Sequence, residues 1–286
     1  MKILTDFDGT LTEIYSEYEV LLEIIKSRLE EKHFPVDRYQ TLFDLAIKEI
    51  QKDYISYGWS DHGRITAYSD EDLFMNIIAG IRMVDKWLHT KPEYSELLDI
   101  LASQNTNLMD ISEYAYSVLH TKPLRPMNTP FLDAMKTIQT LLVRGHEVVV
   151  VSNSPSARIV QKLNYVGLIA SVHEMNPKAQ LRVRGDAAKF KLGEQPQIID
   201  FIRPVDINRP VYRQILVEER PDIVVGDVFS LDLALPCGMA MELPDFSQTR
   251  SLLIAHSYTP EWAKRAIQSA PNGLLIESIT EILEDL

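Results

Sequence analysis

The sequence has little of what secreted, zinc-stabilised and nucleic-acid-binding proteins depend on. Among its 286 residues there is one cysteine, Cys237, so no disulfide can form within the chain, and no cysteine–histidine cluster suggests structural zinc. The formal net charge is -12. Proteins that bind a nucleic-acid duplex or an anionic membrane normally carry a basic face, so we expect neither nucleic acid nor membrane as a partner.

Long apolar runs are also missing. No run is long enough to cross a bilayer, and the N-terminus has no basic segment followed by an apolar core of the kind that directs secretion. We therefore expect a soluble, cytoplasmic protein. The hydrophobic content of 45% and the charged content of 24% are ordinary for globular proteins, and the length suffices for about two domains.

The most informative stretch is residues 3–12. A short apolar run leads into Asp6 and Asp8, which are followed by Gly9 and Thr10. Such a run predicts a buried strand, and the two carboxylates fall at its carboxyl end, where open α/β sheets bind ligands. An Asp-x-Asp-Gly sequence on its own is more often a turn. The interpretation as a site therefore depends on whether other strands also end in polar residues.

A helical insertion follows this first strand. Apolar residues recur at helical spacing in five stretches, about 20–29, 39–50, 73–84, 93–103 and 111–119. The segment 57–64, which contains two glycines, is predicted to be a loop. No strand is predicted in this part of the chain. We expect residues 15–121 to form an all-helical domain.

Strands and helices alternate in the rest of the chain. One apolar strand ends in Ser152 and Asn153, and another ends in Gly226 and Asp227. This alternation predicts an α/β core with a parallel, doubly wound sheet, formed by residues 1–14 and 122–286. Beyond the two strands at 148–151 and 223–225, further strands are expected at 181–184, 190–192, 198–202, 239–243 and 274–276.

Taken together, the polar strand ends resemble the haloacid dehalogenase superfamily in its phosphatase branch. The resemblance rests on the Asp-x-Asp-Gly-Thr-Leu-Thr sequence that begins at Asp6, on the strand that ends in Ser152, and on Asp227 followed five residues later by Asp232. The insertion between the first two motifs resembles the superfamily's helical cap of the first type. The resemblance implies a Rossmann-like core with a cap domain.

The resemblance also implies roles for the first motif. Asp6 would be the nucleophile, because a carboxylate is ionised at neutral pH and its aspartyl-phosphate divides one difficult step into two. Asp8 would be the general acid for the leaving oxygen and then the base for the hydrolytic water. Gly9 permits the turn, Thr10 is expected to orient Asp8, and both would belong to the phosphate site.

The family pattern further implies Mg²⁺, a cation that prefers oxygen ligands. Asp6, Asp227 and the main-chain carbonyl of Asp8 would hold it, and Asp232 would be an additional or outer ligand. Asp232 could instead cap a helix. The Ser152 hydroxyl and the Asn153 backbone N–H would bind phosphate oxygens, although Ser152 could also simply cap the following helix.

The superfamily's third motif, a lysine on the helix before the last acidic strand, has no direct match. The best-fitting position, at the start of the helix that leads to Asp227, is Arg209. Arginine can replace the charge but is not a geometric equivalent of lysine. We favour Arg209 as the catalytic cation, with Lys189 as the main alternative, and Lys191 and Lys178 also remain open.

A helical cap over the site would exclude water and select the leaving group. Family members with such caps usually act on small soluble phosphate esters. We therefore expect a Mg²⁺-dependent phosphatase of a small phosphorylated metabolite, either a monomer or a homodimer. The loop that contains Trp59, His62 and Arg64 could reach the substrate or could be an ordinary polar surface loop.

Two alternatives remain open: a phosphomutase that uses the same aspartate pair, and a non-catalytic regulator that binds a phosphorylated metabolite. A carbon–halogen dehalogenase is disfavoured, because those relatives lack the second aspartate of the first motif. A phosphonatase would need a lysine from the cap, and no candidate stands out.

Overall fold

The computed structural model describes residues 1–12, 15–121 and 129–284. The chain divides into two compact units. The first comprises Met1–Glu13, Trp59–Ala67 and Pro126–Leu286, and the second comprises Ile14–Gly58 and Tyr68–Arg125. The expected boundaries at 14/15 and 121/122 adjoin residues 13–14 and 122–128, which lie outside the described residues. The insertion is not one piece, because Trp59–Ala67 groups with the first unit.

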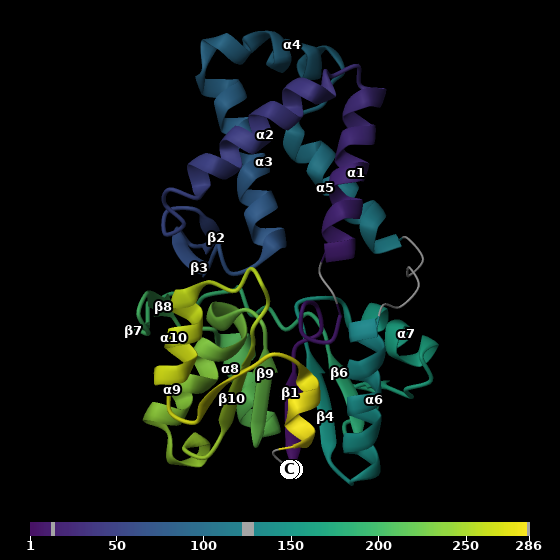
Figure 1. Ribbon diagram of the computed structural model, residues 1–286, viewed down its shortest axis with the longest axis vertical. Helices are drawn as coiled ribbons and strands as arrows, with labels where there is room; N and C mark the ends of the chain where they lie inside the picture. The colour runs from purple at the N-terminus through teal and green to yellow at the C-terminus, as the bar shows by residue number, and fades with distance from the viewer. Residues whose placement is uncertain (13–14, 122–128, 285–286) are drawn as a thin grey trace. The chain divides into compact units, whose positions relative to one another are not determined.

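The first unit contains a seven-stranded sheet in the order β11-β10-β9-β1-β4-β6-β5 (Figure 1). Each of its recorded strand pairs is parallel, as expected. The central strands are continuous apolar runs because helices cover both faces of such a sheet. The strands are β1 (Lys2–Thr5), β4 (Glu147–Val151), β5 (Ser171–Val172), β6 (Leu181–Arg184), β9 (Ile223–Gly226), β10 (Arg250–Ile254) and β11 (Gly273–Ile276).

The register brings the polar strand ends together. β1 lies between β4 and β9, and Thr5, its last residue, pairs with Val150 on one side and Val225 on the other. The three strands are parallel, so all of them end at the same edge of the sheet. The residues that follow, among them Asp6 and Ser152, therefore leave the sheet side by side.

Helices α6 (Thr129–Val143) and α7 (Ser156–Tyr165) cover one face of the sheet. Their apolar residues join alternate strand residues such as Leu181 and Val183 in one buried cluster. Side chains alternate between the faces of a strand, so Arg182 and Arg184 point to the opposite face. Further α-helices of this unit are α8 (Pro210–Glu219), α9 (Ala234–Glu242) and α10 (Glu261–Ser269).

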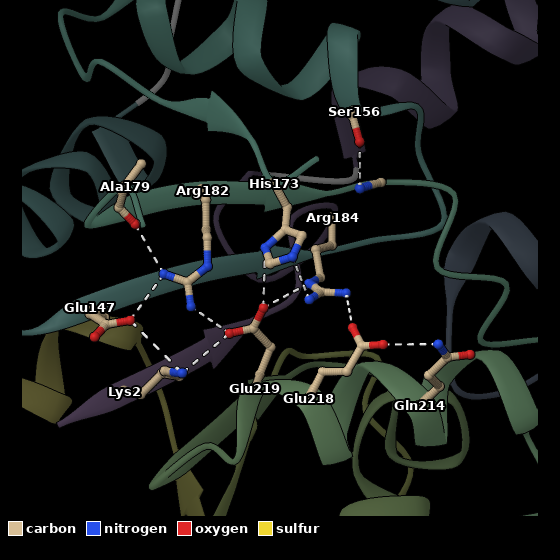
Figure 2. Close-up of polar contacts among 11 residues, drawn as sticks. Lys2, Glu147, Ser156, His173, Ala179, Arg182, Arg184, Gln214, Glu218 and Glu219 are labelled. Carbon is tan, nitrogen blue, oxygen red and sulfur yellow. Dashed lines mark hydrogen bonds and ion pairs between the residues drawn. The ribbon is translucent and has the colours of Figure 1, made fainter. Parts of the chain in front are cut away.

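On the face of the sheet opposite α6 and α7, a network of ion pairs connects α8 to β6 (Figure 2). Glu219, whose side chain is 2% exposed, accepts hydrogen bonds from both Arg182 and Arg184, the latter through Nε at 2.7 Å. Glu218 accepts from Arg184 Nη1 at 2.7 Å. Buried charges of this kind are tolerated only when they are paired and hydrogen-bonded. The network therefore fixes the C-terminal end of α8 against the sheet.

The strand predicted at 239–243 is wrong. These residues belong mostly to α9, and the next strand is β10, which the sequence analysis does not predict. Met239 and Ala240 are buried in an apolar helix, and a short apolar run cannot be assigned to strand or helix by periodicity alone. No strand forms at 190–192, whereas β7 (Ile198–Asp200) pairs antiparallel with β8 (Pro204–Asp206).

The second unit is helical. Asp72 caps α3 by accepting a hydrogen bond from Met75 N at 2.9 Å. In the described ranges, no helix combines the length and the apolar composition that crossing a membrane requires. The helices are α1 (Tyr15–Glu31), α2 (Val36–Ile50), α3 (Leu73–Thr90), α4 (Ser95–Ser103) and α5 (Leu108–Thr121).

The expectation of a purely helical insertion fails at residues 58–68. Strands β2 (Gly58–Asp61) and β3 (Arg64–Tyr68) form a hairpin. The two residues between them, His62 and Gly63, both have positive φ, 50° and 72°. Two left-handed residues in succession are typical of the tight hairpin turns that match strand twist. In the sequence, the hairpin is indicated only by Asp61-His62-Gly63. The glycines alone do not distinguish such a turn from a loop.

Candidate active site

The first motif leaves β1 in a fixed position. The backbone N–H of Asp6 donates to Val225 O at 2.9 Å, which extends the pairing with β9 by one residue. The chain then turns at Gly9, where φ is +81°. A Cβ at Gly9 would lie 2.1 Å from Asp227 Oδ2, so only glycine fits both the conformation and the space. The turn thereby brings the first and last acidic motifs together.

Three carboxylates meet at this edge. Asp6, Asp227 and Asp232 each offer one oxygen, and these oxygens lie within 4.8 Å of one another. Asp232 reaches the group from the turn after β9, where both of its oxygens have donors, Lys189 Nζ at 2.8 Å and Val228 N at 3.0 Å. Three of the four residues expected around a metal ion therefore come together.

Lys189, and not Arg209, lies beside Asp6. The Lys189 ammonium is buried and donates to Asp6 Oδ1 at 2.6 Å. The Arg209 guanidinium donates to two main-chain carbonyls, those of Lys189 and Thr66. The preference for Arg209 as the catalytic cation is therefore wrong. The cation beside Asp6 is Lys189, which lies in the loop after β6 and not at the start of α8. Of the other candidates, Lys191 pairs with Asp61 at 3.3 Å.

The charges at this point do not balance. Burial raises the pKa of Asp6, although the neighbouring Lys189 opposes the shift. Burial alone would lower the pKa of Lys189, but Asp232 and Asp6 outweigh it, so this pKa is raised. Lys189 therefore stays charged. Asp6 and Asp232 share this one ammonium, and Asp227 lies close to both, so a bound cation would favour the ionised form of Asp6.

Asp8 points toward the end of β4. Its Oδ2 accepts a hydrogen bond from Ser154 Oγ at 2.7 Å and a longer one from Ser152 Oγ at 3.5 Å. Within the described residues, its other oxygen, Oδ1, is buried without a hydrogen-bond partner. Ser154 is not among the site residues expected from the sequence. Its signal is the repeat of serine two residues after Ser152, in the turn before α7.

The expected phosphate ligands lie at this edge as well. Ser152 is buried, and its Oγ accepts a hydrogen bond from Ser154 N at 3.0 Å. The N-cap of α7 is Pro155, so Ser152 does not cap this helix. The Asn153 side chain accepts from Lys189 N at 2.8 Å. The position of both residues agrees with the expectation, and their contact with phosphate stays a prediction.

Thr10 contacts Asp227 and not Asp8, the residue that it was expected to orient. Its hydroxyl donates to Asp227 Oδ1 at 2.9 Å. Two further residues of the site follow β10: His256, whose Nε2 lies 2.7 Å from Gly9 O, and Tyr258, whose hydroxyl lies 3.5 Å from Asp227 Oδ2. Neither residue is expected from the sequence, because no strand is predicted directly before them.

The order of these strand ends decides the fold type. Acidic residues follow β1 and β9, a serine follows the adjacent β4, and a largely helical insertion separates the first two motifs. The chain has a parallel α/β fold, and the order of its strands and strand-end residues resembles that of the haloacid dehalogenase (HAD) superfamily.

Comparison with known proteins found no matching family model and no matching curated protein. Solved structures do match at low identity. YfnB of Bacillus subtilis, described as a HAD-hydrolase bound to magnesium, is 10% identical with a TM-score of 0.46, and the match covers 100% of this chain and 97% of YfnB. A predicted phosphoglycolate phosphatase from Haemophilus somnus is 14% identical with a TM-score of 0.45 (99% and 96% covered).

A third match is a protein from Thermotoga maritima described as a beta-phosphoglucomutase. It is 12% identical, with a TM-score of 0.47, and the match covers 100% of this chain and 99% of the other. Likenesses at this level do not decide what the chain does.

Proposed function

We propose that the protein is a Mg²⁺-dependent phosphatase that hydrolyses a small phosphate ester through an aspartyl-phosphate on Asp6. The observation that carries the proposal is the setting of Asp6: a carboxylate at the end of β1, 2.6 Å from the Lys189 ammonium and within reach of Asp227 and Asp232. Asp8, two residues on, is held separately by Ser154 at 2.7 Å. Nucleophile and acid thus have different surroundings.

The residues present fit a hard divalent cation. Mg²⁺ prefers oxygen ligands and is usually bound by one or two carboxylates with several waters. Asp6 and Asp227 would supply the carboxylates, and the Asp8 carbonyl would supply a third oxygen. Asp232 fits an outer place better, because Lys189 and Val228 occupy both of its oxygens. When bound, the ion would neutralise charge on the phosphoryl group.

The chain's own residues support each step of the proposed reaction. The Asp6 carboxylate attacks phosphorus while Asp8 gives a proton to the leaving oxygen. The Lys189 ammonium compensates the negative charge of the nucleophile and the phosphoryl oxygens, and the Ser152 hydroxyl donates to one of those oxygens. Asp8 then takes a proton from water, which attacks phosphorus and frees Asp6.

A small substrate is proposed because of the large helical insertion. In the resembling family, members with such caps usually act on small soluble phosphate esters. In the described residues, the second unit contributes the α-helices α1 to α5 to that insertion. A cap would exclude water from the phosphoryl-enzyme and select the leaving group.

A panel of phosphate esters tests the proposal through phosphate release, with Mg²⁺ and with a chelator. We expect Mg²⁺-dependent turnover of at least one small ester, and loss of about 10³-fold or more in Asp6→Asn, because the amide is not a nucleophile. Asp245→Asn, which alters an exposed carboxylate, is the matched control and should retain activity. If the native protein releases no more phosphate than Asp6→Asn over the whole panel, the proposal is wrong.

A further inference from the structure

Lys189 lies on a tight loop, residues 185–193, which we call the Lys189 loop. Asp186 and Ala188 have left-handed φ angles of 52° and 46°, which non-glycine residues rarely adopt. On one side this loop is bound to the end of β4: Asp186 N donates to Ser154 O at 3.1 Å, and Lys189 N donates to Asn153 Oδ1 at 2.8 Å. A conformation of this kind persists only where its surroundings fix it.

Arg209 fixes the other side of the loop. Its side chain is fully buried at 0% exposure, and its guanidinium donates to the carbonyl oxygens of Lys189 and of Thr66, the latter at 2.6 Å. Thr66 belongs to β3 of the hairpin. A guanidinium presents its donors in a rigid plane, so two carbonyls bound at once are held at a set separation. The main chain of Lys189 is thereby connected to the hairpin.

The hairpin also contacts the residues directly after Lys189. The Trp59 ring meets the Phe190 ring edge to face, with 6.0 Å between centroids. The Asp61 carboxylate accepts a hydrogen bond from Leu192 N at 2.8 Å. These contacts lie within the first unit, to which Trp59–Ala67 belongs. The hairpin therefore contacts the Lys189 loop at Phe190 and Leu192.

We propose that Arg209 is a positioning residue for Lys189, and that the hairpin segment Trp59–Ala67 is the second anchor through which it acts. This inference rests on the proposed function of Lys189 beside Asp6. An ammonium must stay within hydrogen-bond distance of the nucleophile to stabilise developing charge. A displacement of about 1 Å in a catalytic group can cost on the order of 10²-fold in rate. Arg209 limits such displacement at the main chain.

A double-mutant cycle between Arg209→Lys and Lys189→Met tests this, with p-nitrophenyl phosphate as substrate. In the native background we expect Arg209→Lys to lower kcat about 10- to 100-fold. In the Lys189→Met background the same change should cost less than about 3-fold, because the group that it positions is gone. An equal loss in both backgrounds would contradict the proposal. Arg220→Lys, at an exposed arginine just after α8, is the control.

Hydrogen exchange gives a readout that does not need activity. Arg209→Lys should speed amide exchange in residues 185–193 and in Trp59–Ala67, and leave β1 and β4 unchanged. If Arg209→Lys does not fold, Asp61→Ala, which removes the acceptor of Leu192 N, replaces it in both experiments. A native protein without phosphatase activity overturns the proposed function alone. Unchanged exchange in residues 185–193 overturns the positioning role.

Discussion

Gly9 shows how closely the two acidic motifs approach each other. Its φ of +81° is one constraint, and the 2.1 Å that would separate an added Cβ from Asp227 Oδ2 is another. Gly145 has the same conformation, with φ +83°, but open space around it. The two glycines therefore allow backbone strain to be separated from displacement of the carboxylate.

We expect Gly9→Ala to lower kcat by about 100-fold or more, because a displaced Asp227 no longer lies beside Asp6. We expect Gly145→Ala to cost about 1 kcal/mol of unfolding free energy through its positive φ, with kcat unchanged. Steady-state kinetics and urea unfolding of both variants measure this. Equal kcat values in the two variants would show that the contact with Asp227 does not matter.

Helix α8 is held to the sheet by buried charge. The pKa of Glu219 is under opposing influences: burial raises it, but the hydrogen bond and charge of Arg182, together with Arg184, outweigh burial and lower it. A carboxylate whose pKa is lowered by folding stabilises the protein above its unfolded pKa of about 4.3. That contribution is lost as the pH falls through the lower, folded pKa.

We expect Glu219→Gln to lower the free energy of unfolding at pH 7 by about 3–5 kcal/mol, because Arg182 and Arg184 are left without their shared buried partner. Glu218→Gln is the matched control. Its side chain is 43% exposed, so the loss of its pair with Arg184 should cost about 0–1 kcal/mol. Urea unfolding between pH 7 and pH 3 measures both. The difference between native protein and Glu219→Gln should shrink as the pH falls.

Some strands and loops of the core can be predicted from the sequence and others cannot, for physical reasons. Strands β1, β4 and β9 are apolar runs that end in polar residues, so their positions and those of Asp6 and Asp227 follow directly from the sequence. The position of Lys189 does not, because a loop with two left-handed residues has no periodicity. β10 is missed because Met239 and Ala240, shortly before it, have the composition of a strand but lie in a buried helix.

For the whole molecule, the proposed Mg²⁺ site predicts an effect on stability. A ligand that binds only the folded state stabilises it by about 2.7 kcal/mol at a concentration 100 times its Kd. We expect Mg²⁺ to raise the Tm of the native protein by several degrees. Asp227→Ala should remove this shift, and Asp245→Asn should keep it. Scanning calorimetry with and without Mg²⁺ measures it, and an equal shift in Asp227→Ala would place the ion elsewhere.

The hairpin also decides whether the insertion can be exchanged as one unit. The chain passes between its two units four times, at the ends of Ile14–Gly58 and of Tyr68–Arg125. An insertion excised as residues 15–121, or exchanged for that of a relative, would take Thr66 and Asp61 with it and remove partners of Arg209 and Leu192. An exchange of the helical unit should therefore cut at residues 58 and 68 and leave the hairpin in place. The gene segment that encodes the insertion is not an interchangeable module, since part of it completes the core.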